Sequence, residues 1–215
     1  MYRIRAKFQK IGFLCFISHL DLIRTYERAI RRANIPIQYT QGYNPKAKII
    51  FCYPLPTGII SSSEYVDFFL CESMEISIFT NNLNKELPED LKILEAKLIN
   101  LEIIDLCFFN HLKFKISLKE NLNFSQKINE FLEKDTFEIL KNEKKINIKP
   151  FILELTQFNN FIFVTTKVEN GTAKIEEIIS GLKIPFSIIK IIERIEIFGI
   201  QENNFISPFL EKIIK

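Results

Sequence analysis

Residues 2–8, YRIRAKF, and residues 18–34, SHLDLIRTYERAIRRAN, determine the expected fold of the first third of the chain. In the first stretch apolar and basic residues alternate, which is the period of a strand with one apolar and one basic face. In the second stretch Ser18 suits an N-cap, and Asp21 stands three residues on in place of the usual glutamate. Apolar residues then recur at helical spacing and predict one buried face. The opposite face carries four arginines: Arg24, Arg28, Arg31 and Arg32.

The elements predicted around this helix occur in the same order twice. In the first half the helix is followed by two strands, a helix and a strand, at residues 48–53, 64–71, 76–87 and 91–99. In the second half we predict strands at 111–118, 151–155, 161–168 and 188–198, with helices at 125–134, after a Thr172 cap, and from Ser207-Pro208. The order β-α-β-β-α-β predicts an α+β fold of two ferredoxin-like modules packed side by side, residues 1–105 and residues 106–215.

Composition limits the classes of protein to which the chain can belong. It has 215 residues, of which 47% are hydrophobic, with no signal peptide and no apolar stretch of bilayer length. We therefore expect a cytoplasmic protein without a membrane partner. The four cysteines form no C-x-x-C pair and lie among apolar residues, so we expect them to be reduced and buried. Phosphate-loop, dinucleotide, serine-hydrolase and zinc-protease motifs are absent, and we predict neither a metal nor a cofactor.

Charge is distributed unevenly along the chain. Residues 1–60 contain ten Lys or Arg and two Asp or Glu, a net charge of +8, so the other residues carry −5 of the total of +3. Because arginine binds phosphate through two parallel hydrogen bonds, this asymmetry predicts a nucleic-acid surface. The candidate contacts on the strand and helix are Arg3, Arg5, Arg24, Arg28 and Arg31. The alternative is a solvated helix face with internal pairs such as Glu27 with Arg31.

Residues 39–48, YTQGYNPKAK, form a candidate functional loop. Gly42 allows a left-handed turn, and Asn44-Pro45 favours an extended bend. Tyr43 could stack on a base, while Lys46 and Lys48 could reach phosphates. Gln41, Gly42, Asn44 and Pro45 would give the loop its shape. The alternative is a packed connector with no function of its own.

His19 is the candidate catalytic residue. It follows the predicted cap, and a helix N-terminus disfavours the imidazolium, so a neutral His19 could act as a general acid or base. The alternative is a histidine that packs or forms a hydrogen bond. A catalytic site usually combines a nucleophile, a base and a group that stabilises charge. Only one of these is recognisable here, so an enzyme is disfavoured.

Five motifs in order over residues 2–70 resemble a bacterial domain of unknown function that is associated with radical-SAM proteins. They are Tyr2-Arg3-Ile4-Arg5, residues 16–21 (FISHLD), residues 39–45 (YTQGYNP), residues 54–58 (PLPTG) and Glu64-Tyr65. The sequence departs at Ala47, where the family often has proline. Members of that family occur alone or fused behind a radical-SAM protein. More remotely, the layout is similar to the repeat-associated RNA-binding proteins of CRISPR systems, some of which cleave RNA with a histidine near the first helix.

Three hypotheses follow from the residues and the resemblance together. The first is a non-catalytic RNA-binding or adaptor protein that presents RNA, such as tRNA or rRNA, to a radical-SAM enzyme. The second is a protein-only accessory subunit of such an enzyme. The third is a metal-independent ribonuclease that uses His19.

Overall fold

The computed structural model describes residues 1–215 except 101–104, 142–143 and 210–215. In this part of the chain four α-helices accompany a mixed β-sheet, which confirms the predicted α+β class. The chain divides into two compact units. The first comprises Met1–Phe109 and Phe198–Lys215, and the second comprises Asn110–Ile197. The residues after 197 therefore group with the N-terminal part of the chain, and each unit is described separately below.

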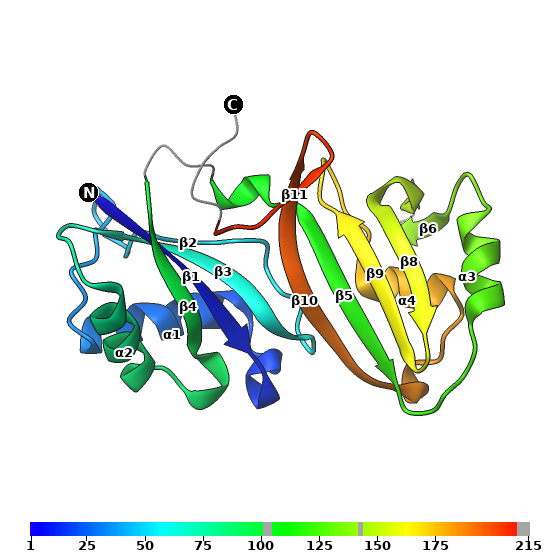
Figure 1. Ribbon diagram of the computed structural model, residues 1–215, viewed down its shortest axis with the longest axis horizontal. Coiled ribbons are helices and arrows are strands. Elements are labelled where there is room, and N and C mark those ends of the chain that lie inside the picture. Colours follow the sequence, from blue (N-terminus) through cyan, green and yellow to red (C-terminus); the bar gives the residue numbers. More distant parts are fainter. Residues whose placement is uncertain (101–104, 142–143, 210–215) are drawn as a thin grey trace. The chain divides into compact units, whose positions relative to one another are not determined.

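The first unit is a sheet with the strand order β4-β1-β3-β2, in which every neighbouring pair is antiparallel. Its elements are β1 (Tyr2–Lys10), the 3-10 turn η1 (Gly12–Phe16), α1 (His19–Arg32), β2 (Ile49–Phe51), β3 (Ile60–Leu70), α2 (Ile76–Glu86), η2 (Glu89–Leu91), β4 (Ile93–Ile99) and η3 (Leu106–Phe108). β1 and β3 are the two central strands (Figure 1). Near the C-terminus, β11 (Asn204–Ile206) pairs with the end of β10 (Ile189–Gln201).

Helix α1 begins and ends where its sequence signals predict. The Ser18 hydroxyl accepts a hydrogen bond from the backbone N–H of Asp21 at 3.1 Å and donates one to its carboxylate at 2.7 Å. The helix ends before Asn34, which has a positive φ of 52°. Asparagine tolerates this left-handed conformation better than most residues, and here it lets the Ile35 N–H bond back to the Ile30 carbonyl at 3.2 Å.

The core of the first unit lies between one face of the sheet and the two helices. Ile4 and Phe8 of β1 pack with Phe68 of β3, Tyr26 of α1 and Phe79 of α2. The buried face predicted for α1 is confirmed by four side chains, Leu22, Tyr26, Ala29 and Ile30. The apolar half of the β1 alternation therefore faces the helices.

Two of the three basic residues of that alternation, Arg3 and Arg5, are also buried. Arg3 is 2% exposed and Arg5 is fully buried. The Arg5 guanidinium donates two hydrogen bonds to the Asp67 carboxylate, at 2.7 and 2.9 Å, and a third to the Pro208 carbonyl at 2.8 Å. Arg3 donates to Asp105 at 3.3 Å and to the Asn100 carbonyl at 3.2 Å. Residues 105–109 and the segment at Pro208 thus cover the face of the sheet away from the helices.

The second unit has the strand order β10-β5-β9-β8. Its elements are β5 (His111–Leu118), α3 (Ser125–Leu132), β6 (Glu138–Lys141), β7 (Lys144–Asn147), η4 (Lys149–Phe151), β8 (Ile152–Phe158), β9 (Phe161–Lys167), α4 (Ile175–Gly181), η5 (Phe186–Ile188) and most of β10. β5 pairs with β9, and β9 with β8, in antiparallel register. Ile116, Ile162 and Val164 are fully buried in this sheet.

Three features of the second half differ from the sequence prediction or fall outside the described residues. The hairpin of β6 and β7 was not predicted, because its lysine-rich sequence alternates weakly. α4 is capped by Lys174 and not by Thr172, since the Glu177 carboxylate accepts from the Lys174 N–H at 2.8 Å. Most of the helix predicted from Ser207-Pro208 lies outside the described residues.

The four cysteines are free thiols, as predicted, but only two are buried. Cys15 and Cys52 lie inside the protein, whereas Cys71 and Cys107 are exposed. The prediction of burial was wrong for the last two: Cys71 directly follows the end of β3, and Cys107 lies in the short 3-10 turn η3, so neither thiol is enclosed by the core. Among the described residues, no helix combines the length and the apolarity needed to cross a bilayer.

We predict that Asp67→Asn destabilises the protein by about 3–5 kcal/mol, because the change leaves buried guanidinium groups without their carboxylate. Denaturant unfolding measures this free energy. The control is Glu95→Gln, which removes an exposed pair of 3.8 Å with Lys97 and should cost less than about 1 kcal/mol. Equal, small losses in the two variants would contradict the buried pair.

Candidate anion-binding surface

The arginines of α1 differ in how much of their charge is already neutralised. Arg24 forms an exposed pair with Asp21 at 3.2 Å, and Arg32 bonds to the Glu86 carboxylate at 2.6 Å. Arg28 and Arg31 are exposed, and neither has a recorded ion pair within the described part of the chain. The two arginines that remain open to a ligand are therefore at the middle and the end of the helix.

The loop predicted to be functional is a closed turn with an exposed tip. Tyr39 and Ala47 form a β-bridge, and the Thr40 N–H bonds to the Lys46 carbonyl at 2.9 Å. The Lys46 N–H in turn bonds to the Thr40 hydroxyl at 3.0 Å. These bonds fix the base of the loop, so its tip projects without needing contacts of its own. All five tip residues are exposed, namely Gln41, Gly42, Tyr43, Asn44 and Pro45.

Two tip residues combine restraint with exposure. Gly42 has a φ of 134°, a conformation that side chains rarely adopt, although a Cβ there would meet nothing within 4 Å. The requirement for glycine is therefore one of backbone shape and not of space. The Tyr43 side chain is fully exposed, with a relative accessibility of 108%. The ring is carried by a loop whose backbone is restrained, and it is free to contact a partner.

Helix α1 and the loop meet at a polar pocket of about 230 Å³. Arg31 and Lys46 bring positive charge to it, and Glu27 brings one carboxylate. The remaining lining comes from four loop residues, Tyr39, Asn44, Pro45 and Ala47. The structure thus brings together Arg31 and Lys46, which are 15 residues apart in sequence and were predicted separately. Tyr39 begins the predicted functional loop, whereas Glu27 was considered only as an ion-pair partner of Arg31 and not as a site residue.

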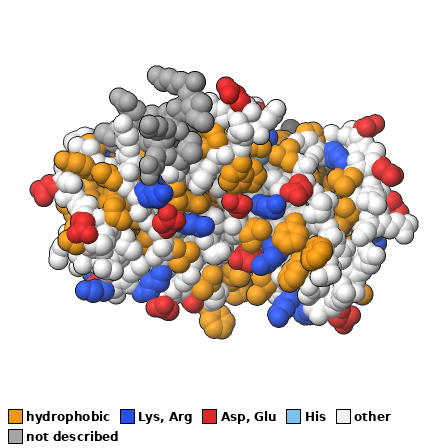
Figure 2. Space-filling model, viewed as in Figure 1, with side chains coloured by type: hydrophobic (Ala, Val, Ile, Leu, Met, Phe, Trp, Pro, Cys, Tyr) orange, Lys and Arg blue, Asp and Glu red, His pale blue; other side chains and the backbone are white. Residues whose placement is uncertain are grey.

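Three other predicted contacts lie elsewhere. Arg3 and Arg5 are enclosed by Asp67, Asp105 and the Pro208 carbonyl, so their guanidinium groups are used inside the protein. Lys48 is half-buried, with its Nζ 4.5 Å from the centre of the Phe69 ring. Figure 2 shows basic and acidic side chains interspersed over the face that it presents, with no continuous basic area there.

His19 is the first residue of α1 and is half-buried against the Phe51 ring, with the ring centres 5.6 Å apart. Its Nδ1 is buried and has no hydrogen-bond partner. Burial lowers the pKa of His19, the nearby Lys10 ammonium lowers it further, and Glu64 opposes both. The lowered pKa favours the neutral imidazole, and its cause is burial and Lys10 and not the helix N-terminus; one of the two ring nitrogens is closed to solvent.

Other buried polar groups lie in the same electrostatic environment. The Tyr26 hydroxyl is buried without a hydrogen-bond partner, and burial together with Glu64 raises its pKa well above the ordinary value. The Lys10 ammonium donates to the Ile17 carbonyl at 3.0 Å. The sequence predicted the burial of Tyr26 on the inner face of α1, but it did not indicate that its hydroxyl and Lys10 lie close to His19 and Glu64. Within the described ranges, no three His, Cys, Asp or Glu side chains are grouped so as to hold a metal ion.

We predict that protonation of His19 opposes folding. Because the pKa of His19 is lowered in the folded state, the unfolded chain binds its proton more readily, so the free energy of unfolding should fall as the pH drops below about 6.5. Urea unfolding of the wild type and of His19→Gln between about pH 7.5 and about pH 5 measures this contribution. The variant should lose less stability over that range. An identical pH dependence in both proteins would show that His19 titrates normally.

One protein family matches most of this chain. The family, described as an uncharacterized protein conserved in bacteria (DUF2344), matches residues 3–179. The match includes β1, α1, the loop at 39–48 and most of the second unit. No curated protein matches the sequence. The chain therefore belongs to this uncharacterised bacterial family.

Proposed function

We propose that the first unit binds single-stranded RNA through the pocket between α1 and the 39–48 loop. The observation that carries the proposal is the meeting of Arg31 and Lys46 in one pocket beside the exposed Tyr43 ring. Phosphate oxygens would bind Arg31 and Lys46, since both bring hydrogen-bond donors and positive charge. Arg28, one turn earlier on the same helix, would contact the next phosphate, with Arg24 beyond it.

Tyr43 would supply the contact to a base. An exposed aromatic ring on a restrained loop loses little conformational freedom when a base stacks on it. Glu27 also lines the pocket, and its carboxylate would repel a phosphate placed against it. The phosphate would therefore bind between the Arg31 and Lys46 side chains.

We further propose that the RNA is presented to a radical-SAM enzyme. This part rests on the family resemblance of the five motifs, and it needs a surface for a protein partner. Three large apolar side chains near the start of α1 are exposed: Phe13 at 88%, Phe16 at 65% and Leu20 at 64%. Apolar side chains concentrated in so short a segment are typical of protein contacts. A protein-only accessory role would use the same surface without RNA.

The ribonuclease alternative has less support from the geometry. A general base must reach the proton that it removes, and the Nδ1 of His19 is buried without a partner. The pocket that would hold phosphates is lined by α1 and loop residues that do not include His19. The proposal is therefore a binding protein and not a nuclease.

We also propose that each unit is a ferredoxin-like module. In the first unit the support is the strand order β4-β1-β3-β2 with α1 after the first strand and α2 after the third. The second unit has the equivalent order, β10-β5-β9-β8, with α3 after β5 and α4 after β9. The β6–β7 hairpin is an insertion between α3 and β8 in this scheme.

The charge-reversal variant Arg28→Glu, Arg31→Glu, Lys46→Glu should lose RNA binding while its melting temperature stays close to that of the wild type. The three side chains are exposed, so their replacement costs little stability. Fluorescence anisotropy with a labelled single-stranded RNA measures the affinity at several salt concentrations. Because three phosphate contacts are lost, the slope of log affinity against log salt concentration should become shallower by about two units.

The control for this experiment has the same change in net charge on the second unit, through Lys119→Glu, Lys134→Glu and Lys190→Glu. These exposed lysines lie outside the pocket, so RNA affinity should fall much less.

In the same assay Tyr43→Ala should weaken binding by about 1–3 kcal/mol, because the aromatic ring that stacks on a base is lost, and Tyr43→Phe should not. If both triple variants bind RNA as the wild type does, the RNA proposal is wrong and the protein-only role remains.

A further inference from the structure

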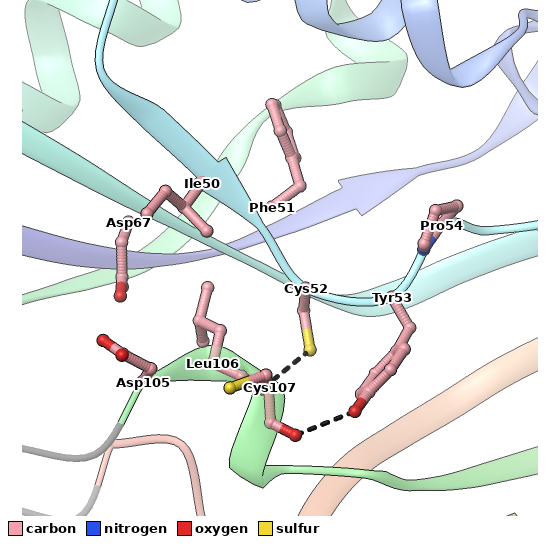
Figure 3. Close-up of a pocket in the computed structure, with 9 residues that line it drawn as sticks. All are labelled: Ile50, Phe51, Cys52, Tyr53, Pro54, Asp67, Asp105, Leu106 and Cys107. Carbon is pink, nitrogen blue, oxygen red and sulfur yellow. Dashed lines mark hydrogen bonds between the residues drawn. The ribbon is translucent and has the colours of Figure 1, made fainter. Parts of the chain in front are cut away.

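A second cavity lies within the first unit, on the face of the sheet away from α1 and α2. Ile50 of β2, Asp67 of β3 and Arg5 of β1 are aligned across neighbouring strands on this face. The cavity measures about 270 Å³. It is bounded by β2, the residues just after β2, and η3 (Figure 3).

The walls of this cavity are mainly apolar and are held in place by hydrogen bonds. Ile50, Pro54 and Leu106 provide carbon surface. The Tyr53 hydroxyl donates to the Cys107 carbonyl at 2.8 Å, and the Cys52 thiol donates to the Leu106 carbonyl at 3.5 Å (Figure 3). These bonds tie the two walls together, so the cavity exists before any ligand enters.

The charged groups that line the cavity are both carboxylates, those of Asp67 and Asp105. Asp67 is 2% exposed and is held by Arg5, whereas the Asp105 side chain is 77% exposed and bonds to Arg3 at 3.3 Å. No lysine or arginine lines the cavity among the described residues. Each carboxylate is paired with an arginine, but its oxygens can accept further hydrogen bonds, so the lining suits a ligand that brings N–H donors and apolar surface.

We propose that this cavity binds a nucleobase that carries an exocyclic amino group, such as adenine or cytosine. A flat heteroaromatic ring suits a cavity of this size between apolar walls and Tyr53, and a carboxylate accepts a hydrogen bond from an exocyclic amine. Asp105 is the acceptor, because its carboxylate is largely open to solvent. The base comes from a free nucleoside or from a nucleic-acid strand. The proposal stands on the cavity alone and does not require the RNA surface of α1.

The two exposed cysteines allow a site-specific test. Cys107 lines the cavity, while Cys71 lies elsewhere and serves as an internal control in the same molecule. The rate at which N-ethylmaleimide modifies each thiol is followed by mass spectrometry. At a concentration about ten times its Kd, adenosine should slow modification of Cys107 about tenfold and leave Cys71 unchanged. Purine riboside, which lacks the amino group, should protect Cys107 much less.

Matched variants and a second measurement make the test decisive. Ile50→Trp fills the cavity and should abolish the effect of adenosine, whereas Ile78→Trp, on α2 and equally exposed, should not. Saturation-transfer NMR with adenosine gives the same comparison without relying on a thiol. Protection by adenosine identifies a nucleoside site, and protection only by oligoadenylate identifies a base within a strand.

Three results would overturn the proposal. The first is a Cys107 rate that neither adenosine, cytidine nor oligoadenylate changes. The second is an equal slowing of Cys71 and Cys107, which indicates nonspecific binding. The third is equal protection by adenosine and purine riboside, which shows that the carboxylates do not read the amino group.

Discussion

The buried pairing of Arg5 with Asp67 is the contact on which the architecture of the first unit depends. The two residues stand directly opposite each other in the register of β1 and β3. A slip of one residue would move Asp67 to the helix side of the sheet and leave two arginines uncompensated in the interior. The pairing therefore fixes the alignment of the two central strands more strictly than apolar packing alone.

The same charges explain why distant segments cover this face. Arg5 has a donor left after pairing with Asp67, and the Pro208 carbonyl accepts it. Arg3 donates hydrogen bonds to the Asp105 carboxylate and to the Asn100 carbonyl. The chain that reaches these positions also brings η3 next to β2, and the cavity with its two carboxylates forms between them. A buried charge near the N-terminus thus shapes a cavity whose lining extends to residue 107.

Five of the ten basic residues in 1–60 consequently fall into two groups with different roles. Arg3 and Arg5 are internal and serve the fold. Arg28, Arg31 and Lys46 are exposed and are available to an external anion. The proposed RNA surface therefore rests on the helix and the loop alone.

Local signals predicted well what depends on neighbouring residues. The Ser18 cap, the buried face of α1 and the order of the main strands could all be read from spacing and capping residues. The burial of Arg3 and Arg5 could not be predicted from the sequence. The alternation of a central strand is the same whether its basic face meets solvent or a distant partner such as Asp67, which is 62 residues from Arg5. The pocket at Arg31 and Lys46 was only half predictable, since its two sides were recognised but their meeting depends on the Tyr39–Ala47 bridge.

The division of arginines into internal and external groups is tested most directly by phenylglyoxal modification of the native protein, followed residue by residue with mass spectrometry. The account predicts that Arg28 and Arg31 react rapidly and are protected by single-stranded RNA, while Arg3 and Arg5 react only after unfolding. Rapid modification of Arg3 and Arg5 in the folded protein, or no protection of Arg28 and Arg31 by RNA, would contradict it.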